Sequence, residues 1–173
     1  MKVKIEIKNR FTGKVLFEFE TENNTIQKTV EEAIKSGCDL SGCDLSFSDL
    51  RGCNLRGCNL SFSNLRGCDL SGCDLRGCDL SGCDLRGCDL SGKTIKTAAV
   101  FTGLYTYIVI PYITEDNEKR IKLGCHDRLL SEWESDFWNN NDEFPNDGSI
   151  KSESRLMAFK SAKMWFEIID KTV

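Results

Sequence analysis

The chain has 173 residues, of which 27 are acidic and 23 are basic, so its net charge at pH 7 is -4. A chain of this length can bury a sizeable core. The near balance of charge argues against a general nucleic-acid or lipid-surface binder, which usually shows a concentrated basic patch. We therefore expect neither direct nucleic-acid binding nor a membrane partner.

The N-terminal residues alternate charge with Val3, Ile5 and Ile7 and lack the continuous apolar segment of a signal peptide. No run elsewhere in the sequence is long enough and apolar enough to span a bilayer. We expect a soluble, cytoplasmic protein.

Residues 1–37 are predicted to form a hairpin followed by a short helix. Two runs of alternating apolar residues, 3–7 and 15–19, flank a glycine-containing loop. Asn24 or Thr25 can then cap the helix. If the next segment is a stack of coils, its open first coil needs covering, so we expect an N-terminal cap. The alternative is that the hairpin is itself a binding element.

Residues 38–92 consist of one five-residue unit written eleven times, beginning CDLSG CDLSF SDLRG. Each unit has Leu at its centre, Cys or Ser two residues earlier, and Asp or Asn between them. Residues two apart in an extended chain point the same way, so the small residue and the Leu share the inner face. A helix would spread a period of five around its surface and is excluded. The chain must therefore turn a corner every five residues.

This pattern resembles the pentapeptide-repeat family, whose signature is a small residue, Asp or Asn, Leu and two further residues. Residues 38–42 and the ten units that follow match the signature without a break. The resemblance implies a mainly β fold, a short right-handed quadrilateral β-helix with four units per coil. Residues 93–95 and 98–100 keep a hydrophobic centre at the same spacing, so we expect the coil to end near Val100.

Coils of twenty residues would stack outward side chains into columns. The acidic column would be Asp49, Asp69 and Asp89, and the basic column Arg56, Arg76 and Lys96. The simpler role for the acids is to hydrogen-bond the backbone of the corners, as Asp and Asn do in turns. The alternative is that the acidic column imitates the phosphates of duplex DNA, as in those family members that occupy the DNA-binding saddle of a type II topoisomerase.

Two units differ from the others, because Phe47 and Phe62 replace the usual Gly. Each Phe either packs on a cap, a loop or a neighbouring corner, or it anchors a partner, since exposed aromatic residues are typical of interface hot spots. The candidate binding surface comprises these two residues and the two charged columns.

Nine of the ten cysteines lie in the repeat, separated by multiples of five residues. This spacing provides no close pair of the kind that structural zinc sites use. We expect reduced thiols that pack as small apolar side chains, with no metal and no cofactor. The alternative is a thiol or metal protein built on the stacked cysteines.

Residues 101–173 are expected to form an α+β domain. Runs over 103–114 and 120–123 read as a second hairpin, and apolar residues over 129–138 recur at helical spacing. A last helix begins at about Ser152, and its stripe is Ala158, Ala162, Trp165 and Ile169 with Leu156, Phe159 and Phe166 beside it. Because this stripe is wide, a homodimer through the C-terminal domain is a further hypothesis.

The segments GLYTYIVIPYI, GCHDRLLSEWE and EFPNDGS resemble the tail of phage and prophage pentapeptide-repeat proteins. The resemblance implies a bacterial host or a phage-infected cell and adds no mechanism. Catalytic residue types cluster only at Cys125, His126 and Asp127, and neighbours in a strand point to opposite faces. No glycine-rich phosphate loop or paired-carboxylate motif is present. We expect no catalytic residues and no enzyme.

The sequence thus predicts three parts: a hairpin-helix cap at 1–37, a pentapeptide-repeat β-helix at 38–100 and an α+β domain at 101–173. The leading hypothesis is a non-enzymatic phage-type protein that acts as a protein-interaction scaffold or inhibits a host protein. One alternative is a DNA-mimic inhibitor of a DNA-binding enzyme such as a type II topoisomerase or a nuclease. The other is the thiol or metal protein.

Overall fold

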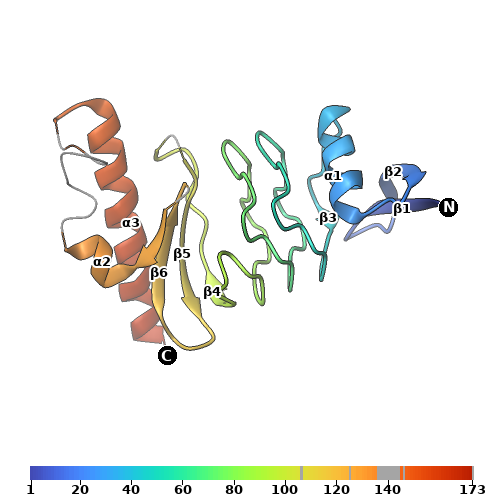
Figure 1. The fold of residues 1–173 in the computed structure, drawn as a ribbon. Coiled ribbons are helices and arrows are strands. Elements are labelled where there is room, and N and C mark those ends of the chain that lie inside the picture. The colour runs from blue at the N-terminus through green and yellow to red at the C-terminus, as the bar shows by residue number, and fades with distance from the viewer. Residues whose placement is uncertain (106, 125, 136–144, 146, 173) are drawn as a thin grey trace. The chain divides into compact units, whose positions relative to one another are not determined.

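The computed structural model describes residues 1–105, 107–124, 126–135, 145 and 147–172 (Figure 1). The chain divides into two compact units, Met1–Ile95 and Lys96–Val173. Across these described ranges, no helix is both long and apolar enough to cross a membrane.

The first unit begins with the predicted hairpin, in which β1 (Lys2–Asn9) pairs antiparallel with β2 (Val15–Glu22). Strand β3 (Cys43–Asp44), at the start of the repeat, pairs with the other edge of β1, which gives the order β2-β1-β3. The hairpin is therefore hydrogen-bonded directly to the first turn of the repeat.

Helix α1 (Ile26–Lys35) follows the hairpin, as predicted. Thr25 is its N-cap, because the Thr25 hydroxyl accepts the backbone N–H of Lys28 at 3.2 Å. The helix also contacts the first turn of the repeat: the Gln27 amide donates to the carbonyl oxygen of Arg51 at 2.8 Å, and Glu31 accepts the N–H of Asn54 at 3.2 Å. These bonds pair the carbonyl oxygen of Arg51 and the N–H of Asn54, which lie in the first twenty-residue coil and have no preceding coil to pair with.

The repeat is a stack of turns with a period of twenty residues. Parallel bridges join residues twenty apart, for example Asp49 with Asp69 and Asp69 with Asp89. Within each unit the chain reverses in a β-turn, as where the N–H of Cys43 donates to the carbonyl oxygen of Leu40 at 3.2 Å. Four five-residue units therefore make one period, and the Leu of every unit is buried. The expected stacking and the expected inner face are confirmed.

The small inner residues donate hydrogen bonds in addition to packing in the core. The Cys68 thiol donates to the carbonyl oxygen of Leu45 in the preceding turn at 2.7 Å. Likewise, the Ser63 hydroxyl donates to the carbonyl oxygen of Leu40 at 3.1 Å. Cys and Ser therefore exchange at this position because both are small and both can donate to a Leu carbonyl.

The stack ends earlier than the sequence predicts. After Gly92 the chain runs back, so that Thr94 bridges Asp89 in the antiparallel sense and the N–H of Ile95 donates to Cys88 at 2.8 Å. Lys96 belongs to the second unit, where its amine donates to Asn117 at 2.9 Å. The expected continuation of the coil to about Val100 is wrong, and Lys96 does not extend the column of Arg56 and Arg76.

The second unit contains an antiparallel sheet of order β4-β5-β6-β7 followed by two helices. The strands are β4 (Ile95–Ala98), β5 (Val109–Thr114), β6 (Lys119–Leu123) and β7 (His126–Leu129). The helices are α2 (Leu130–Glu134) and α3 (Ile150–Thr172). The predicted second hairpin is confirmed as β5 and β6, although its first strand begins at Val109. Phe137, Trp138 and most of the loop over 139–148 lie outside the described residues.

Helix α3 packs its small and aromatic residues against the sheet. Ala158, Ala162 and Phe166 join Val109 and Trp133 in one buried cluster. The sequence placed Phe166 beside the stripe, whereas the structure places it in the core. The other side of the helix remains exposed.

Candidate interaction surface

Phe47 and Phe62 are the two large apolar side chains of the repeat that are exposed, with 76% and 60% of their surface accessible. Both residues occupy the turn position that glycine fills in the other units, and both have positive φ angles, 58° and 59°. This left-handed region is unfavourable for a residue with a Cβ atom. The turn therefore imposes its conformation on the two phenylalanines, which occupy a position that glycine would fill with less strain.

Each phenylalanine ring lies across the glycine at the same position in the next turn. A Cβ atom added to Gly67 would be 2.6 Å from Cδ1 of Phe47, and one added to Gly82 would be 2.6 Å from Cδ1 of Phe62. The expected packing on a neighbouring corner is thus present, yet most of each ring is still exposed. Glycine at 67 and 82 gives the rings a flat support that orients them.

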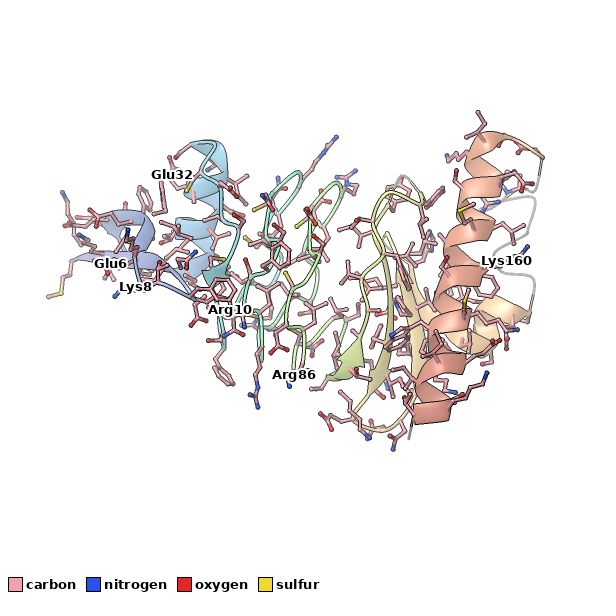
Figure 2. The ribbon with its side chains drawn as sticks, turned by 180° about the vertical axis from the view of Figure 1, so that it is seen from behind. Glu6, Lys8, Arg10, Glu32, Arg86 and Lys160 are labelled. Carbon is pink, nitrogen blue, oxygen red and sulfur yellow. The ribbon has the colours of Figure 1, made fainter. Side chains whose placement is uncertain are left out.

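An arginine is hydrogen-bonded to the backbone of each exposed phenylalanine. The backbone N–H of Phe47 donates to the carbonyl oxygen of Arg66 at 2.8 Å. Arg10, in the loop of the hairpin, donates from Nη1 to the carbonyl oxygen of Phe62 at 3.2 Å, and its guanidinium is 5.1 Å from the centre of the Phe11 ring. Figure 2 shows Arg10 next to the turns of the repeat. We call Arg10, Phe11, Phe47, Phe62 and Arg66 the phenylalanine surface.

The other arginines of the repeat differ in whether an acid neutralises them. Three arginines follow an Asp by two residues and form ion pairs with two contacts: Asp49 with Arg51, Asp74 with Arg76, and Asp84 with Arg86. Arg56 and Arg66 follow an Asn instead, and neither forms an ion pair with a residue that the structure describes. Arg76, from the predicted basic column, is therefore neutralised, whereas Arg56 is not.

The predicted acidic column forms, because Asp49, Asp69 and Asp89 bridge one another in register. Arg51 pairs with Asp49 at 2.6 Å, and its Nε lies 3.6 Å from Asp69. Asp89 accepts the backbone N–H groups of three residues that follow it. In all eleven units the Asp or Asn side chain accepts the N–H two residues later, so the expected turn role is confirmed.

The ion pairs change the acidity of the aspartates. Hydrogen bonds from the arginine side chains lower the pKa of Asp49, Asp74 and Asp84 to about 2. Bonds from the backbone N–H groups of the turns act in the same direction. These carboxylates remain charged, and bound to their arginines, well below neutral pH.

The nine cysteines of the repeat are free thiols. Burial raises the pKa of Cys43 to about 11 and the pKa of Cys58 and Cys83 to about 12. The thiolate is the form that attacks electrophiles and binds metals, so the raised pKa of these three thiols favours the packing role for them. A hydrogen bond with Cys88 lowers the pKa of Cys68 instead. Among the described side chains, no three His, Cys, Asp or Glu residues are arranged to hold a metal ion.

Cys125 lies outside the described residues, so its position beside His126 is not described. Asp127 belongs to a buried network in which it accepts the hydroxyl of Tyr112 at 2.7 Å and Nε of Arg120 at 3.1 Å. Desolvation and the bond to Asp127 raise the pKa of Tyr112. The carboxylate of Asp127 thus joins three strands of the sheet.

The sequence prediction named Phe47 and Phe62 but not Arg10, Phe11 or Arg66. The sequence did contain a sign of Arg66. Asn64, two residues before Arg66, replaces the Asp found at the equivalent positions 44 and 84, so the arginine has no acid two residues before it. The approach of Arg10 and Phe11 depends on how the hairpin docks on the repeat, which the local sequence does not encode.

A family model described as pentapeptide repeats matches residues 36–57 and 53–92, with 8 copies. A search of curated proteins found no match to the chain. The matched residues contain the two phenylalanines, Arg66, the acidic column and the two arginines of the basic column, but not Lys96.

Replacing Gly67 by Ala should lower the free energy of unfolding more than replacing Gly52 does. Both glycines have a φ near 70°, so the strain on a new Cβ is shared, but only at Gly67 does the Cβ meet a ring. We expect a difference of about 1 kcal/mol, the scale of an aromatic contact. Urea denaturation of both variants measures it. In a Phe47→Gly background the difference should vanish, and its persistence would show that the ring does not lie on Gly67.

Acid should destabilise the protein through its ion-paired aspartates. Their pKa is lower in the folded protein than the value of about 3.9 in an unfolded chain, so the folded state binds fewer protons. The resulting stabilisation is complete above about pH 4 and is lost as the pH falls towards about 2. Urea denaturation from pH 7 to pH 2.5 measures this loss.

A triple variant in which Asp49, Asp74 and Asp84 become Asn is the matched control, because Asn also accepts the turn N–H. Its stability should depend less on pH between 4 and 2.5 than that of the parent chain. An equal acid dependence in both proteins would contradict the role of these three carboxylates.

Proposed function

Because residues 36–92 of this chain are pentapeptide repeats, we propose that the protein is a non-enzymatic scaffold that binds a partner protein through Phe47 and Phe62. The proposed fold of the repeat is a right-handed quadrilateral β-helix, supported by four units per period of twenty residues. The proposed organisation is a cap at 1–37, a repeat that ends after Gly92, and an α+β domain that begins at about Lys96 rather than at 101.

The observation that carries the proposal is the exposure of two strained aromatic residues on a regular surface. Glycine fits the positive φ of these turns with less strain than a residue with a Cβ atom. Phenylalanine at this position is largely exposed, although it packs on the next glycine. Exposed aromatic residues held by a rigid framework are typical of the anchors of protein interfaces.

The finer parts of the proposal rest on the resemblance of the C-terminal segments to phage and prophage proteins. On that basis the partner is a protein of the bacterial host, and binding either inhibits it or recruits it. The location that follows is the cytoplasm of a bacterial host or of a phage-infected cell.

The two alternatives have weaker support. An acidic column that imitates DNA should present uncompensated charge, but Arg51 neutralises Asp49 and lies near Asp69, and Asp89 binds turn N–H groups. A thiol or metal function needs accessible thiolates, whereas burial raises the pKa of Cys43 and Cys58 far above neutrality.

Phe47→Gly and Phe62→Gly should remove partner binding without unfolding the chain. The immobilised full chain is incubated with bacterial lysate, and the retained proteins are identified by mass spectrometry. Loss of one aromatic anchor costs at least about 2 kcal/mol, which is roughly 30-fold in affinity. Val15→Ser, at another exposed apolar residue, is the control and should retain binding. Recovery of the same proteins by the doubly substituted chain would contradict the proposal.

We also propose that a second copy of the chain pairs with the exposed side of α3. Ile150, Met157 and Met164 recur every seven residues on this helix and are exposed. An antiparallel pair of α3 helices buries these three side chains in one apolar seam.

Met164→Lys should shift this dimer to monomer, because it places a charge in the apolar seam. Analytical ultracentrifugation over a range of concentrations measures the shift. Val15→Lys adds the same charge to the first unit and should leave the dimer unchanged. A parent chain that is monomeric at every concentration rules out the pairing.

A further inference from the structure

Arg66 is an exposed arginine that lies along the chain between Phe62 and Gly67. Residues 63–66 run from Phe62 to Gly67, the glycine on which the ring of Phe47 lies. The backbone of Arg66 is fixed on both sides: its N–H donates to Asn64 at 3.2 Å, and its carbonyl oxygen accepts from Phe47 at 2.8 Å. The backbone that carries the exposed Arg66 side chain is therefore held in place next to Gly67.

The acids in the same column are already occupied. In the preceding turn Asp44 accepts the hydroxyl of Ser46 at 2.7 Å and the amide of Asn64 at 3.1 Å. In the following turn Asp84 forms its two-contact ion pair with Arg86. Asn64 itself carries no charge. Within the part of the chain that the structure describes, Arg66 thus forms no ion pair, and its charge acts on Asp84 only as a minor contribution that lowers the pKa of that carboxyl.

Arg10 supplies a second guanidinium at the neighbouring corner. It is held by its hydrogen bond to the carbonyl oxygen of Phe62 and by its contact with the ring of Phe11. It forms no ion pair with a residue in the described ranges. Arg66 and Arg10 are therefore each hydrogen-bonded to the backbone of one of the two exposed phenylalanines, and neither forms an ion pair with a described residue.

Building on the proposed function, we propose that the partner segment is an acidic peptide whose carboxylates bind Arg66 and Arg10 while its apolar side chains cover Phe47 and Phe62. Arginine binds carboxylates through two parallel hydrogen bonds, which are strong and directional. The rings exclude water around these contacts, which strengthens the charge pairs. A continuous polyanion such as single-stranded DNA fits less well, because its evenly spaced phosphates would also face Asp44 and Asp84 in the column of Asn64, whereas a peptide can place carboxylates at the arginines alone.

The test is selection of a random dodecapeptide display library on the immobilised full chain. The enriched peptides should combine Asp or Glu with Leu, Phe or Trp. Synthetic copies should bind the chain in fluorescence polarisation, and their affinity should fall as NaCl rises from low to high concentration. Enrichment of basic or uncharged peptides, or of none, would overturn the proposal.

The variants locate the charge contact. Arg66→Gln should weaken binding of the selected peptide about tenfold or more, the effect of losing one charge-assisted hydrogen bond. Two matched controls should change binding little. Arg86→Gln removes an arginine of the same column that is ion-paired with Asp84. Arg56→Gln removes an arginine that forms no ion pair with a described residue and lies ten residues before Arg66. Equal losses for Arg66→Gln and Arg56→Gln would mean that net charge alone attracts the peptide and would refute the site.

Two further outcomes separate this proposal from the proposed function. If Phe47→Gly abolishes binding and Arg66→Gln does not, the phenylalanine anchors stand and the acidic partner is refuted. If Arg66→Gln abolishes binding and both Phe→Gly variants do not, the acidic peptide stands and the anchors are refuted. An oligo(dT) of twenty nucleotides that competes as well as the peptide would also refute the acidic-peptide assignment.

Discussion

The fold of the repeat depends on one hydrogen bond that forms inside each five-residue unit and closes its corner. The side chain of Asp or Asn accepts the backbone N–H two residues later in all eleven units. Together with the turn bond to the Leu carbonyl, this contact closes each corner without help from neighbouring segments. Other backbone groups then join successive coils, as where the N–H of Leu45 donates to Asn64 and the N–H of Asn64 donates to Cys43, around bridges between residues twenty apart. Repetition of one local bond thus sets the register of the stack.

This arrangement lets single residues change the surface while the turn stays the same. Asp and Asn both close the corner, but only Asp forms an ion pair with the arginine two residues later. Arg86 is therefore paired with Asp84, whereas Arg66, which follows Asn64, has no ion pair with a residue that the structure describes. Gly and Phe both occupy the positive-φ position, but only Phe exposes an apolar ring. The distinctive chemistry of the molecule therefore comes from substitutions that preserve the fold.

Sequence reasoning succeeded where an interaction is local and failed where it spans segments. The hairpin, the cap of α1, the inward Leu and the role of Asp and Asn follow from alternation, capping and turn chemistry. The end of the stack did not follow, because residues 93–95 imitate another unit while Gly92 and Ser91, with φ angles of 75° and 133°, turn the chain back. The pairing of Phe62 with Arg10 joins residues 52 apart, which no local pattern encodes.

The central claim is that a partner docks on the phenylalanine surface, and site-specific photo-crosslinking in living bacteria tests it most directly. A photoreactive phenylalanine analogue replaces Phe47 or Phe62, and in a matched chain it replaces Arg56, which is exposed elsewhere in the same stack. The account predicts the same crosslinked protein at positions 47 and 62 and none at 56. Crosslinks of equal yield at position 56, or none at 47 and 62, would contradict it.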